Sequence, residues 1–376
     1  MRVVVAPDKF KGSATAAEVA AALAAGLRRE RPDLEIAEMP VADGGDGTVA
    51  AVLDAGFAPV LTTAEGPTGE SVHATFALKA GTAVIELADV AGLRRLPGER
   101  FAPLTASTYG VGQVIAAALD CGATTIVLGI GGSATTDGGA GMVQALGVRL
   151  ADERGRDLAR GGSVLSDLAA VDLAGLDGRI AGVRLLVASD VDNPLLGPAG
   201  AAAVFGPQKG AAPSDVALLD RALGRWSALT ASVTGLDLPE APGAGAAGGT
   251  GFAAMTYLGA RLVPGADLVL GLIGFDAALT GAGLVITGEG SLDRQSLGGK
   301  APVGVARAAA RHGVPVAVVA GRILLTAQEL AAAGFAAAYS LADLEPSQAA
   351  SMATATELLE QIGGRVALGP LVTAVT

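Results

Sequence analysis

The chain is poor in the residue types that build disulfides, zinc sites and histidine-based active sites. Its 376 residues include one cysteine, two histidines and only 3% aromatic residues. A single cysteine excludes an internal disulfide and favours a reducing compartment, and we expect Cys121 to be a packed small side chain. With only His73 and His312 available, neither a zinc site nor histidine-based catalysis is expected.

Long apolar runs and excess positive charge are also missing. Although 51% of the residues are hydrophobic, no stretch of about eighteen is free of glycine and charge, which argues against a membrane span. The first residues, MRVVVAPDKF, lack the long apolar core of a signal peptide and predict a β-strand instead. A net charge of −11 argues against a nucleic-acid surface. We therefore expect a cytoplasmic protein that binds neither membranes nor nucleic acid.

Three common nucleotide-binding or catalytic motifs are either absent or lack the structural context that they need. The Gly-Gly-Lys at 298–300 has Arg294 where a P-loop needs its first glycine, and Ala301 follows it. The glycines at 243–248 match a dinucleotide-binding pattern but follow a proline rather than a strand, which argues against a nicotinamide cofactor. No G-x-S-x-G nucleophile elbow occurs. Any catalytic chemistry must therefore come from other segments.

Lysine is scarce, and its positions are selective. Five lysines stand against 21 arginines, and they are Lys9, Lys11, Lys79, Lys209 and Lys300. All except Lys79 lie beside glycines or acidic residues. Because lysine is a compact charge that reaches phosphate oxygens one at a time, we expect Lys9, Lys11 and Lys300 to contact a phosphate or carboxylate. The case for Lys209 is weaker, and the alternative for each is a solvated turn residue.

The hydrophobic pattern predicts an α/β protein. Apolar β-branched runs alternate with alanine-rich helical stretches, which is typical of parallel strands joined by helices. A capping box at Thr15–Glu18 marks the first helix. Residues 57–88 alternate with period two and predict an antiparallel meander. The predicted strands are 3–6, 36–40, 125–128, 184–188, 284–287, 316–320 and 336–340, and the predicted helices are 15–29, 48–54, 109–119, 141–146, 216–229, 301–312, 326–333 and 346–362.

This pattern favours two domains. The economical layout is a Rossmann-like, doubly wound parallel-sheet domain built from residues 1–58 and 284–376. A second, mixed α/β domain would be inserted at 59–283. Residues 195–255 are rich in alanine, glycine and proline, and apart from the 216–229 helix their structure is hard to predict.

Glycine-rich or acidic segments follow the predicted strands, at 8–13, 43–48, 129–139, 189–194 and 287–293. Glycine lets backbone N–H groups approach an anion, and an adjoining helix N-terminus adds favourable potential. Within 131–139, the hydroxyls of Ser133, Thr135 and Thr136 complete a plausible phosphate cradle. We therefore predict a nucleotide or phosphate site.

The same segments carry many carboxylates, which would repel phosphate. A divalent cation shared between carboxylates and phosphate oxygens resolves this conflict, so we expect Mg²⁺ and phosphoryl transfer. Each acid taken alone could equally be a turn or helix-cap residue. The acids are Asp43, Asp46, Asp190, Asp192, Glu289 and Asp293.

Taken together, these segments resemble the bacterial glycerate kinase family. The matching stretches are APDKFKGSATAAEVA, PVADGGDGT, GPTG, TASTYGVG, GIGGSATTDGGAGM, SDVDNPLLGPAGAAAVFGPQKGA, PGAGAAGGTG and ITGEGSLDRQSLGGKAPVGVA. They cover nearly the whole chain in family order. The resemblance implies a Rossmann-like domain with a second α/β domain inserted, and ATP, Mg²⁺ and D-glycerate as ligands. It also favours 2-phosphoglycerate over 3-phosphoglycerate as product.

The resemblance also suggests roles for individual residues. Lys9 and Lys11 are candidates for the glycerate carboxylate or the transferring phosphoryl group. Asp190 or Asp192 would orient or deprotonate the acceptor hydroxyl, so these two and Lys9 are the expected catalytic residues. The other assignments are Asp46 and Asn193 to the substrate, Glu289 and Asp293 to the metal, and Gly131, Gly132, Ser133, Thr135, Thr136 and Lys300 to the ATP phosphates.

Two alternatives stay open at the level of sequence. The first is a kinase of the same architecture that acts on a related small hydroxy acid. The second is a non-catalytic sugar-acid sensor, although no DNA-binding or partner module is visible to support it. A homodimer is compatible with the alanine-rich helices, because a helix face and a dimer seam have the same pattern.

Overall fold

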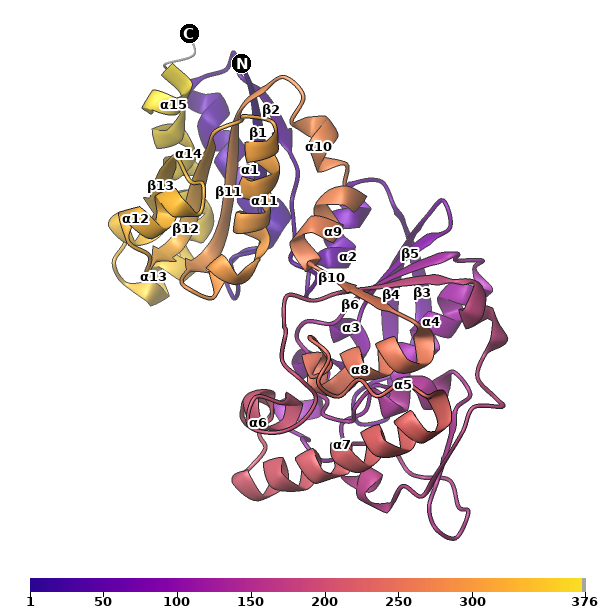
Figure 1. Cartoon of the computed structure of the whole chain (residues 1–376). Helices are drawn as coiled ribbons and strands as arrows, with labels where there is room; N and C mark the ends of the chain where they lie inside the picture. The colour runs from indigo at the N-terminus through magenta and orange to yellow at the C-terminus, as the bar shows by residue number, and fades with distance from the viewer. Residues whose placement is uncertain (374–376) are drawn as a thin grey trace. The chain divides into compact units, whose positions relative to one another are not determined.

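The computed structural model describes residues 1–373, and the chain divides into two compact units (Figure 1). Unit 1 contains 1–43, 50–56 and the chain from Pro264 onward, and unit 2 contains 44–49 and 57–263. The fold is of the predicted α/β class, with one parallel and one mixed sheet. No helix among residues 1–373 is long and apolar enough to cross a membrane.

Unit 1 is built on a five-stranded parallel sheet in the order β13-β12-β11-β1-β2. Parallel sheets are buried on both faces, and Val3, Val4 and Val5 of β1 are accordingly fully buried. The strands are β1 (Arg2–Pro7), β2 (Glu35–Glu38), β11 (Ala282–Leu292), β12 (Val316–Ile323) and β13 (Ala337–Ser340).

Helices α1 (Ala16–Glu30) and α14 (Ala355–Ala367) share a core with one face of this sheet (Figure 1). The predicted capping box is present, because the Thr15 hydroxyl accepts from Glu18 N while the Glu18 carboxylate accepts from Thr15 N. The other helices around this sheet are α9 (Gly265–Leu272), α10 (Phe275–Ala278), α11 (Ala301–Arg311), α12 (Ala327–Ala332), α13 (Gln348–Ala353) and α15 (Pro370–Thr373), and α2 spans Thr48–Asp54.

Glycine allows α1 and α14 to pack closely. A Cβ at Gly26 would lie 1.9 Å from the Glu360 carbonyl oxygen, and a Cβ at Gly363 would lie 2.3 Å from the Leu23 carbonyl oxygen. Both clashes are with backbone atoms, which cannot relieve them by a change of rotamer as a side chain can. The crossing therefore depends on the absence of a side chain at these positions.

We expect Gly26→Ala to lower the free energy of unfolding by about 1–3 kcal/mol, the usual cost of overpacking a core. Thermal melting of both proteins measures this. Gly271→Ala in α9 is the matched control, because a Cβ there meets nothing within 4 Å, and alanine is the better helix former. Equal melting temperatures for Gly26→Ala and the parent protein would contradict the close crossing.

Unit 2 is built on a six-stranded mixed sheet in the order β10-β9-β6-β5-β4-β3. The predicted meander is confirmed, since β3, β4 and β5 pair antiparallel. From β5 onward the neighbours are parallel. The strands are β3 (Ala58–Glu65), β4 (Ser71–Lys79), β5 (Thr82–Glu86), β6 (Thr125–Gly129), β9 (Arg184–Ala188) and β10 (Arg261–Val263), with a separate pair β7 (Arg149–Ala151) and β8 (Ala170–Asp172).

The segment that was hard to predict contains three helices of unit 2. These are α6 (Ala201–Phe205), α7 (Pro213–Thr234) and α8 (Ala246–Leu258), and all three contribute to one core with the sheet. The remaining helices of this unit are α3 (Ala88–Ala91), α4 (Tyr109–Asp120) and α5 (Ala140–Ala145).

Three local predictions were wrong. Strand β11 does not end at Thr287 but continues to Leu292, because β12 pairs with it as far as Ile323. The helix predicted at 346–362 is two helices, α13 and α14, separated at Thr354. Cys121 is exposed rather than packed. It caps the C-terminus of α4 and lies beyond Leu119, the last buried residue of that helix.

The C-terminal part of unit 1 begins at Pro264, earlier than the 284 suggested by the sequence pattern. The reason is packing between α9 and α11. A Cβ at Gly304 of α11 would lie 2.6 Å from the Ala266 Cβ of α9, so these helices are in close contact.

Candidate functional site

The carboxyl ends of β5, β6 and β9 meet at one edge of the sheet in unit 2. Their register pairs Glu86 with Gly129 and Gly129 with Ala188. The glycine-rich loop after β6 and the acidic loop after β9 therefore start side by side. The sequence predicted each loop at a strand end, and the sheet order brings these two together.

The glycine-rich loop, residues 130–139, presents two buried hydroxyls that lack a partner. Thr135 and Thr136 are fully buried, and neither Oγ1 has a hydrogen-bond partner among residues 1–373. An unsatisfied buried hydroxyl costs about 1–3 kcal/mol, so such a group needs an explanation in a bound ligand or water. The donor set fits the oxygens of a phosphate group.

Glycines in this loop allow another segment of unit 2 to pass against it. A Cβ at Gly131 would lie 2.7 Å from the Gly45 Cα, and a Cβ at Gly129 would lie 2.5 Å from the Gly44 carbonyl oxygen. Gly132 is exposed, and its carbonyl accepts from the Leu93 amide at 3.1 Å. The glycines of 43–48 and 129–139 thus serve the packing of one loop on the other.

Asp46 lies in the same segment and pairs with an arginine. Its Oδ2 is 3.1 Å from Arg94 Nη1, and both side chains are well exposed. Exposed ion pairs contribute little stability. The predicted substrate ligand therefore has a protein partner that a substrate would have to replace or share.

Lys209 contacts the glycine-rich loop from within the core. Its side chain is 2% exposed, and Nζ donates to Ser133 Oγ at 2.9 Å and to the Thr135 carbonyl at 2.5 Å. Burial lowers the pKa of Lys209 to about 7, and the nearby Asp137 carboxylate acts in the opposite direction. The sequence ranked Lys209 below the other glycine-flanked lysines, and only the tertiary contacts reveal its position.

Asp137 is a fully buried residue that no sequence pattern marks as functional. Its Oδ2 accepts from Thr108 N and Oγ1, both at 2.8 Å, and from Gly141 N at 3.2 Å. Burial raises the pKa of Asp137, and these hydrogen bonds oppose the rise. The carboxylate ties the base of the loop to the start of α4, and its place in a glycine-rich run gave no separate signal.

The acidic loop after β9 holds Asp190 and Asp192. Asp190 is half-buried and Asp192 is exposed. The side-chain amide of Asn193 donates to the Ala199 carbonyl at 2.8 Å, so this predicted substrate ligand also closes its own loop. Of the two candidate bases, Asp190 has the more enclosed environment.

In unit 1, the segment after β1 has charged side chains on both sides of Phe10. Phe10 is 2% exposed and pairs its backbone with Ala14 in a tight turn. This burial holds Lys9 and Lys11 on either side of it, with Lys11 exposed and Lys9 half-buried. The predicted pair of lysines is therefore displayed by a turn that Phe10 anchors.

Asp8 was not among the predicted site residues, yet its pKa is the most strongly shifted of the acids in this segment. It is 7% exposed, and its Oδ1 lies 3.8 Å from Lys9 Nζ. Burial raises the pKa of Asp8 to about 7; Lys9 opposes the rise, while the carboxylates of Asp43 and Glu289 add to it. A carboxyl group that titrates near neutral pH is suited to proton transfer.

Glu289 and Lys300 face each other in unit 1. Glu289 is 7% exposed, its Oε2 lies 3.6 Å from Lys300 Nζ, and its Oε1 has no hydrogen-bond partner among the described residues. Burial raises the pKa of Glu289, while hydrogen bonding to Ser296 and the charge of Lys300 oppose the rise. Lys300 also stands immediately before α11, at the helix end that favours anions.

Asp293 is used mainly to cap a turn. Its Oδ1 accepts from the amides of Gln295 at 2.8 Å and Ser296 at 3.3 Å. Within residues 1–373, no three His, Cys, Asp or Glu side chains converge closely enough to hold a metal ion. The unpartnered Glu289 oxygen still fits Mg²⁺, which commonly takes one or two carboxylates and completes its shell with phosphate oxygens and water.

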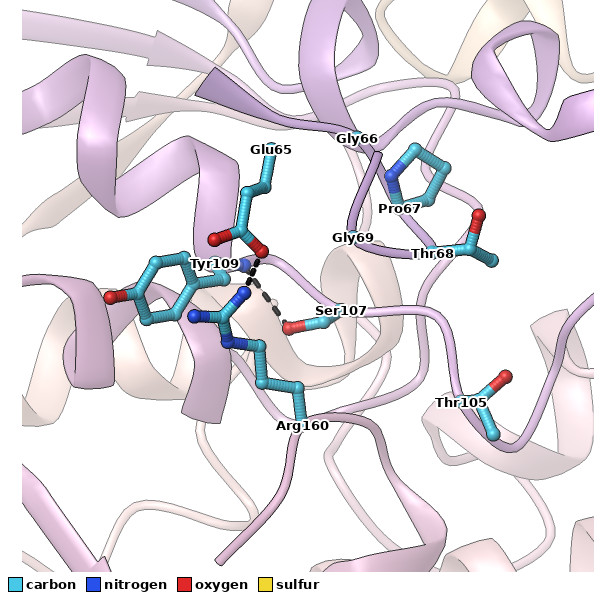
Figure 2. Close-up of a pocket in the computed structure, with 9 residues that line it drawn as sticks. All are labelled: Glu65, Gly66, Pro67, Thr68, Gly69, Thr105, Ser107, Tyr109 and Arg160. Carbon is cyan, nitrogen blue, oxygen red and sulfur yellow. Dashed lines mark hydrogen bonds and ion pairs between the residues drawn. The ribbon is translucent and has the colours of Figure 1, made fainter. Parts of the chain in front are cut away.

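Unit 2 also contains a pocket of about 230 Å³. Figure 2 shows the Arg160 guanidinium beside the Tyr109 ring and paired with the Glu65 carboxylate. Arg160 Cζ lies 3.3 Å from the centroid of the Tyr109 ring. The pair neutralises itself, so this pocket lacks the excess positive charge expected of a phosphate site. Its lining residues are Glu65, Gly66, Pro67, Thr68, Gly69, Thr105, Ser107, Tyr109 and Arg160.

Comparisons with known proteins place this chain in a family. The model of the Glycerate kinase family matches residues 3–368. A glycerate kinase of Halalkalibacterium halodurans is 45% identical over 97% of each chain, and the glycerate 2-kinase of Escherichia coli K12 is 44% identical over 86% of each. A crystal structure from Salmonella typhimurium LT2, of a protein provisionally named glycerate kinase 2, has a TM-score of 0.86 and 42% identity, with each chain fully covered. The chain is therefore a kinase that belongs to the glycerate kinase family.

Proposed function

We propose that this protein transfers the γ-phosphoryl group of ATP to D-glycerate, with 2-phosphoglycerate as the product. The observation that carries the proposal is the glycine-rich loop of a glycerate kinase family member, in which two buried threonine hydroxyls lack hydrogen-bond partners within residues 1–373. One relative, from Escherichia coli K12, is named glycerate 2-kinase, which supports the choice of product.

The proposed roles follow the chemistry of each group. Gly131, Gly132 and the hydroxyls of Ser133, Thr135 and Thr136 would bind the ATP phosphates. Lys300, at the N-terminus of α11, is a further candidate for contacts with these phosphates. Asp190 would accept the proton of the acceptor hydroxyl, with Asp192 as the second candidate. Lys9 and Lys11 would bind the glycerate carboxylate or the transferring group, and Asp46 and Asn193 would contact glycerate hydroxyls.

Mg²⁺ would be held by Glu289 and Asp293 together with phosphate oxygens. When bound, such an ion neutralises charge on the phosphates and orients them. Lys300 shares the Glu289 carboxylate, so it would keep that side chain ionised and in place. Glu289 Oε1 is buried and has no hydrogen-bond partner among the residues that the structure describes, which makes it the best candidate for a coordinating atom.

The larger framework is also a proposal. We propose that unit 1 is a Rossmann-like domain and that unit 2 is inserted into it, consistent with the parallel order of the unit 1 sheet and the chain segments of each unit. We further propose a cytoplasmic protein, on the ground of its single cysteine. A homodimer is the proposed assembly.

The proposal is tested by measuring ADP release with ATP, Mg²⁺ and D-glycerate, followed by NMR of the product. A phosphorus signal coupled to the C2 proton is expected. Coupling to the C3 protons would retain the kinase and overturn the product assignment. No ADP release from folded protein would reject D-glycerate as acceptor, and related hydroxy acids would then be assayed.

We expect Thr136→Val to raise the KM for ATP about 10-fold or more, as for a lost hydrogen bond to a charged group. Because the hydroxyl has no hydrogen-bond partner in the described part of the chain, its removal should leave the melting temperature unchanged or higher. The measurements are steady-state kinetics and thermal melting.

Thr230→Val is the matched control. The Thr230 hydroxyl is buried but lies 2.7 Å from the Tyr257 hydroxyl, so its loss should lower the free energy of unfolding by about 1–3 kcal/mol and leave the KM for ATP unchanged. If Thr136→Val destabilises the protein like Thr230→Val and spares the KM, the hydroxyl is structural.

A further inference from the structure

We propose that Lys209 is a positioning residue for the nucleotide phosphates, which fixes Ser133 and the Thr135–Thr136 peptide as donors toward a bound anion. This inference rests on the proposed function, in which the glycine-rich loop binds ATP. It assigns a role to the glycine-flanked lysine for which the sequence made the weakest case.

The backbone directs Lys209 into the core. Lys209 ends the short helix Pro207–Lys209, and Gly210 follows in the left-handed conformation, with φ of 87°. A Cβ at Gly210 would lie 2.4 Å from Phe101 Cβ, so the turn after Lys209 requires glycine. The side chain is 2% exposed and ends at the glycine-rich loop.

The ammonium group decides which way the hydrogen bonds of the loop run. An ammonium only donates, so Ser133 Oγ must accept from it and keeps its own hydrogen for another acceptor. The Thr135 carbonyl also accepts from Lys209. Since no peptide bond in the described chain is cis, the N–H of the same peptide, on Thr136, points the opposite way. The Ser133 oxygen and the Thr135 carbonyl thus face Lys209. The Ser133 hydroxyl hydrogen and the Thr136 N–H point in other directions.

A charge on the buried Lys209 side chain is costly. Burial disfavours an ammonium, and it lowers the pKa of this one to about 7. The carboxylate whose charge opposes this effect, Asp137, is already engaged by hydrogen bonds from Thr108, Gly139 and Gly141. An anion bound on the loop would favour the charged lysine and offset the burial. A purely structural link between two loops would be made at lower cost by a neutral donor.

The choice of lysine over arginine agrees with this role. The chain uses arginine for 21 of its 26 basic residues, yet it has a lysine at this enclosed position. A guanidinium is larger and presents a planar fork of five donors, whereas an ammonium reaches two oxygens from a narrow stem. The site therefore selects a compact charge.

The test compares Lys209→Met with the parent protein. Methionine keeps the length and apolar volume of the side chain but removes its charge and donors. We expect the Kd for Mg²⁺–ATP, measured by titration calorimetry, and the KM for ATP to rise about 10-fold or more, with a roughly unchanged KM for D-glycerate. Lys79→Met is the matched control, because Lys79 is exposed on β4, and it should match the parent protein in the Kd for Mg²⁺–ATP and in both KM values.

A merely structural role predicts a different result. In that case Lys209→Met would lower the melting temperature and leave the Kd for Mg²⁺–ATP unchanged at temperatures where the variant is folded, which would overturn the proposal. If the variant does not fold, lysines labelled with ¹³C at Cε in the otherwise unaltered protein give a second measurement. Arginine variants of the other four lysines assign the Lys209 signal. This signal should shift when a non-hydrolysable ATP analogue is added, and an unchanged signal would also overturn the proposal.

This design separates the two proposals. If the parent protein binds Mg²⁺–ATP but releases no ADP with D-glycerate, the proposed function fails, while the comparison of Kd values still decides the role of Lys209. If D-glycerate is phosphorylated and Lys209→Met binds Mg²⁺–ATP as tightly as the parent protein, only the role of Lys209 fails.

Discussion

Asp190→Asn should lower kcat at least ~100-fold, within the range for loss of a positioned general base, while the fold survives. Asp190 follows β9, and the register of β9 with β6 starts its loop beside the glycine-rich loop. Asparagine has nearly the same shape but cannot take a proton from the acceptor hydroxyl. Turnover under saturating substrates, together with circular dichroism to confirm folding, measures the effect.

Asp192→Asn is the matched control for this prediction. Asp192 lies two residues further along the same loop and is exposed, whereas Asp190 is half-buried. We expect a much smaller loss of kcat for Asp192→Asn. Near-normal turnover in Asp190→Asn would remove Asp190 from the mechanism, and a large loss confined to Asp192→Asn would transfer the role of base to that residue.

At pH values above 7, Asp8→Asn should have a higher melting temperature than the parent protein. Its activity should be lower. The folded protein holds the pKa of Asp8 at about 7, against an ordinary value of 3.8. Between these two values the folded state binds more protons than the unfolded state, so stability falls as pH rises from about 4 to 7. The full shift corresponds to roughly 4–5 kcal/mol, at about 1.4 kcal/mol per pKa unit.

Asparagine removes this penalty, because it cannot ionise and its side-chain oxygen can still accept from the Lys9 amide as Asp8 does. At pH 8 we therefore expect a melting temperature several degrees higher, and near pH 4 little difference. The loss of activity is expected because a buried acid kept at such a cost is typical of functional sites.

Asp33→Asn provides a control of opposite sign. Its hydrogen bonds with Arg31 hold the pKa of Asp33 at about 2, so its removal should not raise the melting temperature at any pH. If Asp8→Asn melts at the same temperature as the parent protein at pH 8, Asp8 ionises without penalty in the folded state.

The local structure was largely predictable because its signals are local. Thr15 and Glu18 carry the capping box within four residues, and the structure forms it. The alternating run at 57–88 predicts a meander, because side chains of a strand point to opposite faces in turn, and β3, β4 and β5 form it. Strand β11 was predicted too short because its glycines resemble a loop, and only pairing with β12 reveals that the strand continues.

The sequence by itself determined the α/β class, most of the elements and the glycine-rich and acidic segments that identify the family, because each depends on neighbours along the chain. Tertiary structure decided which of these segments meet. It brought the loops after β6 and β9 together through sheet order, gave Asp8 its raised pKa through burial, and placed Lys209 under Ser133 and Thr135, more than seventy residues away in sequence. Burial and long-range contacts depend on the whole packed core, so no local pattern carries them.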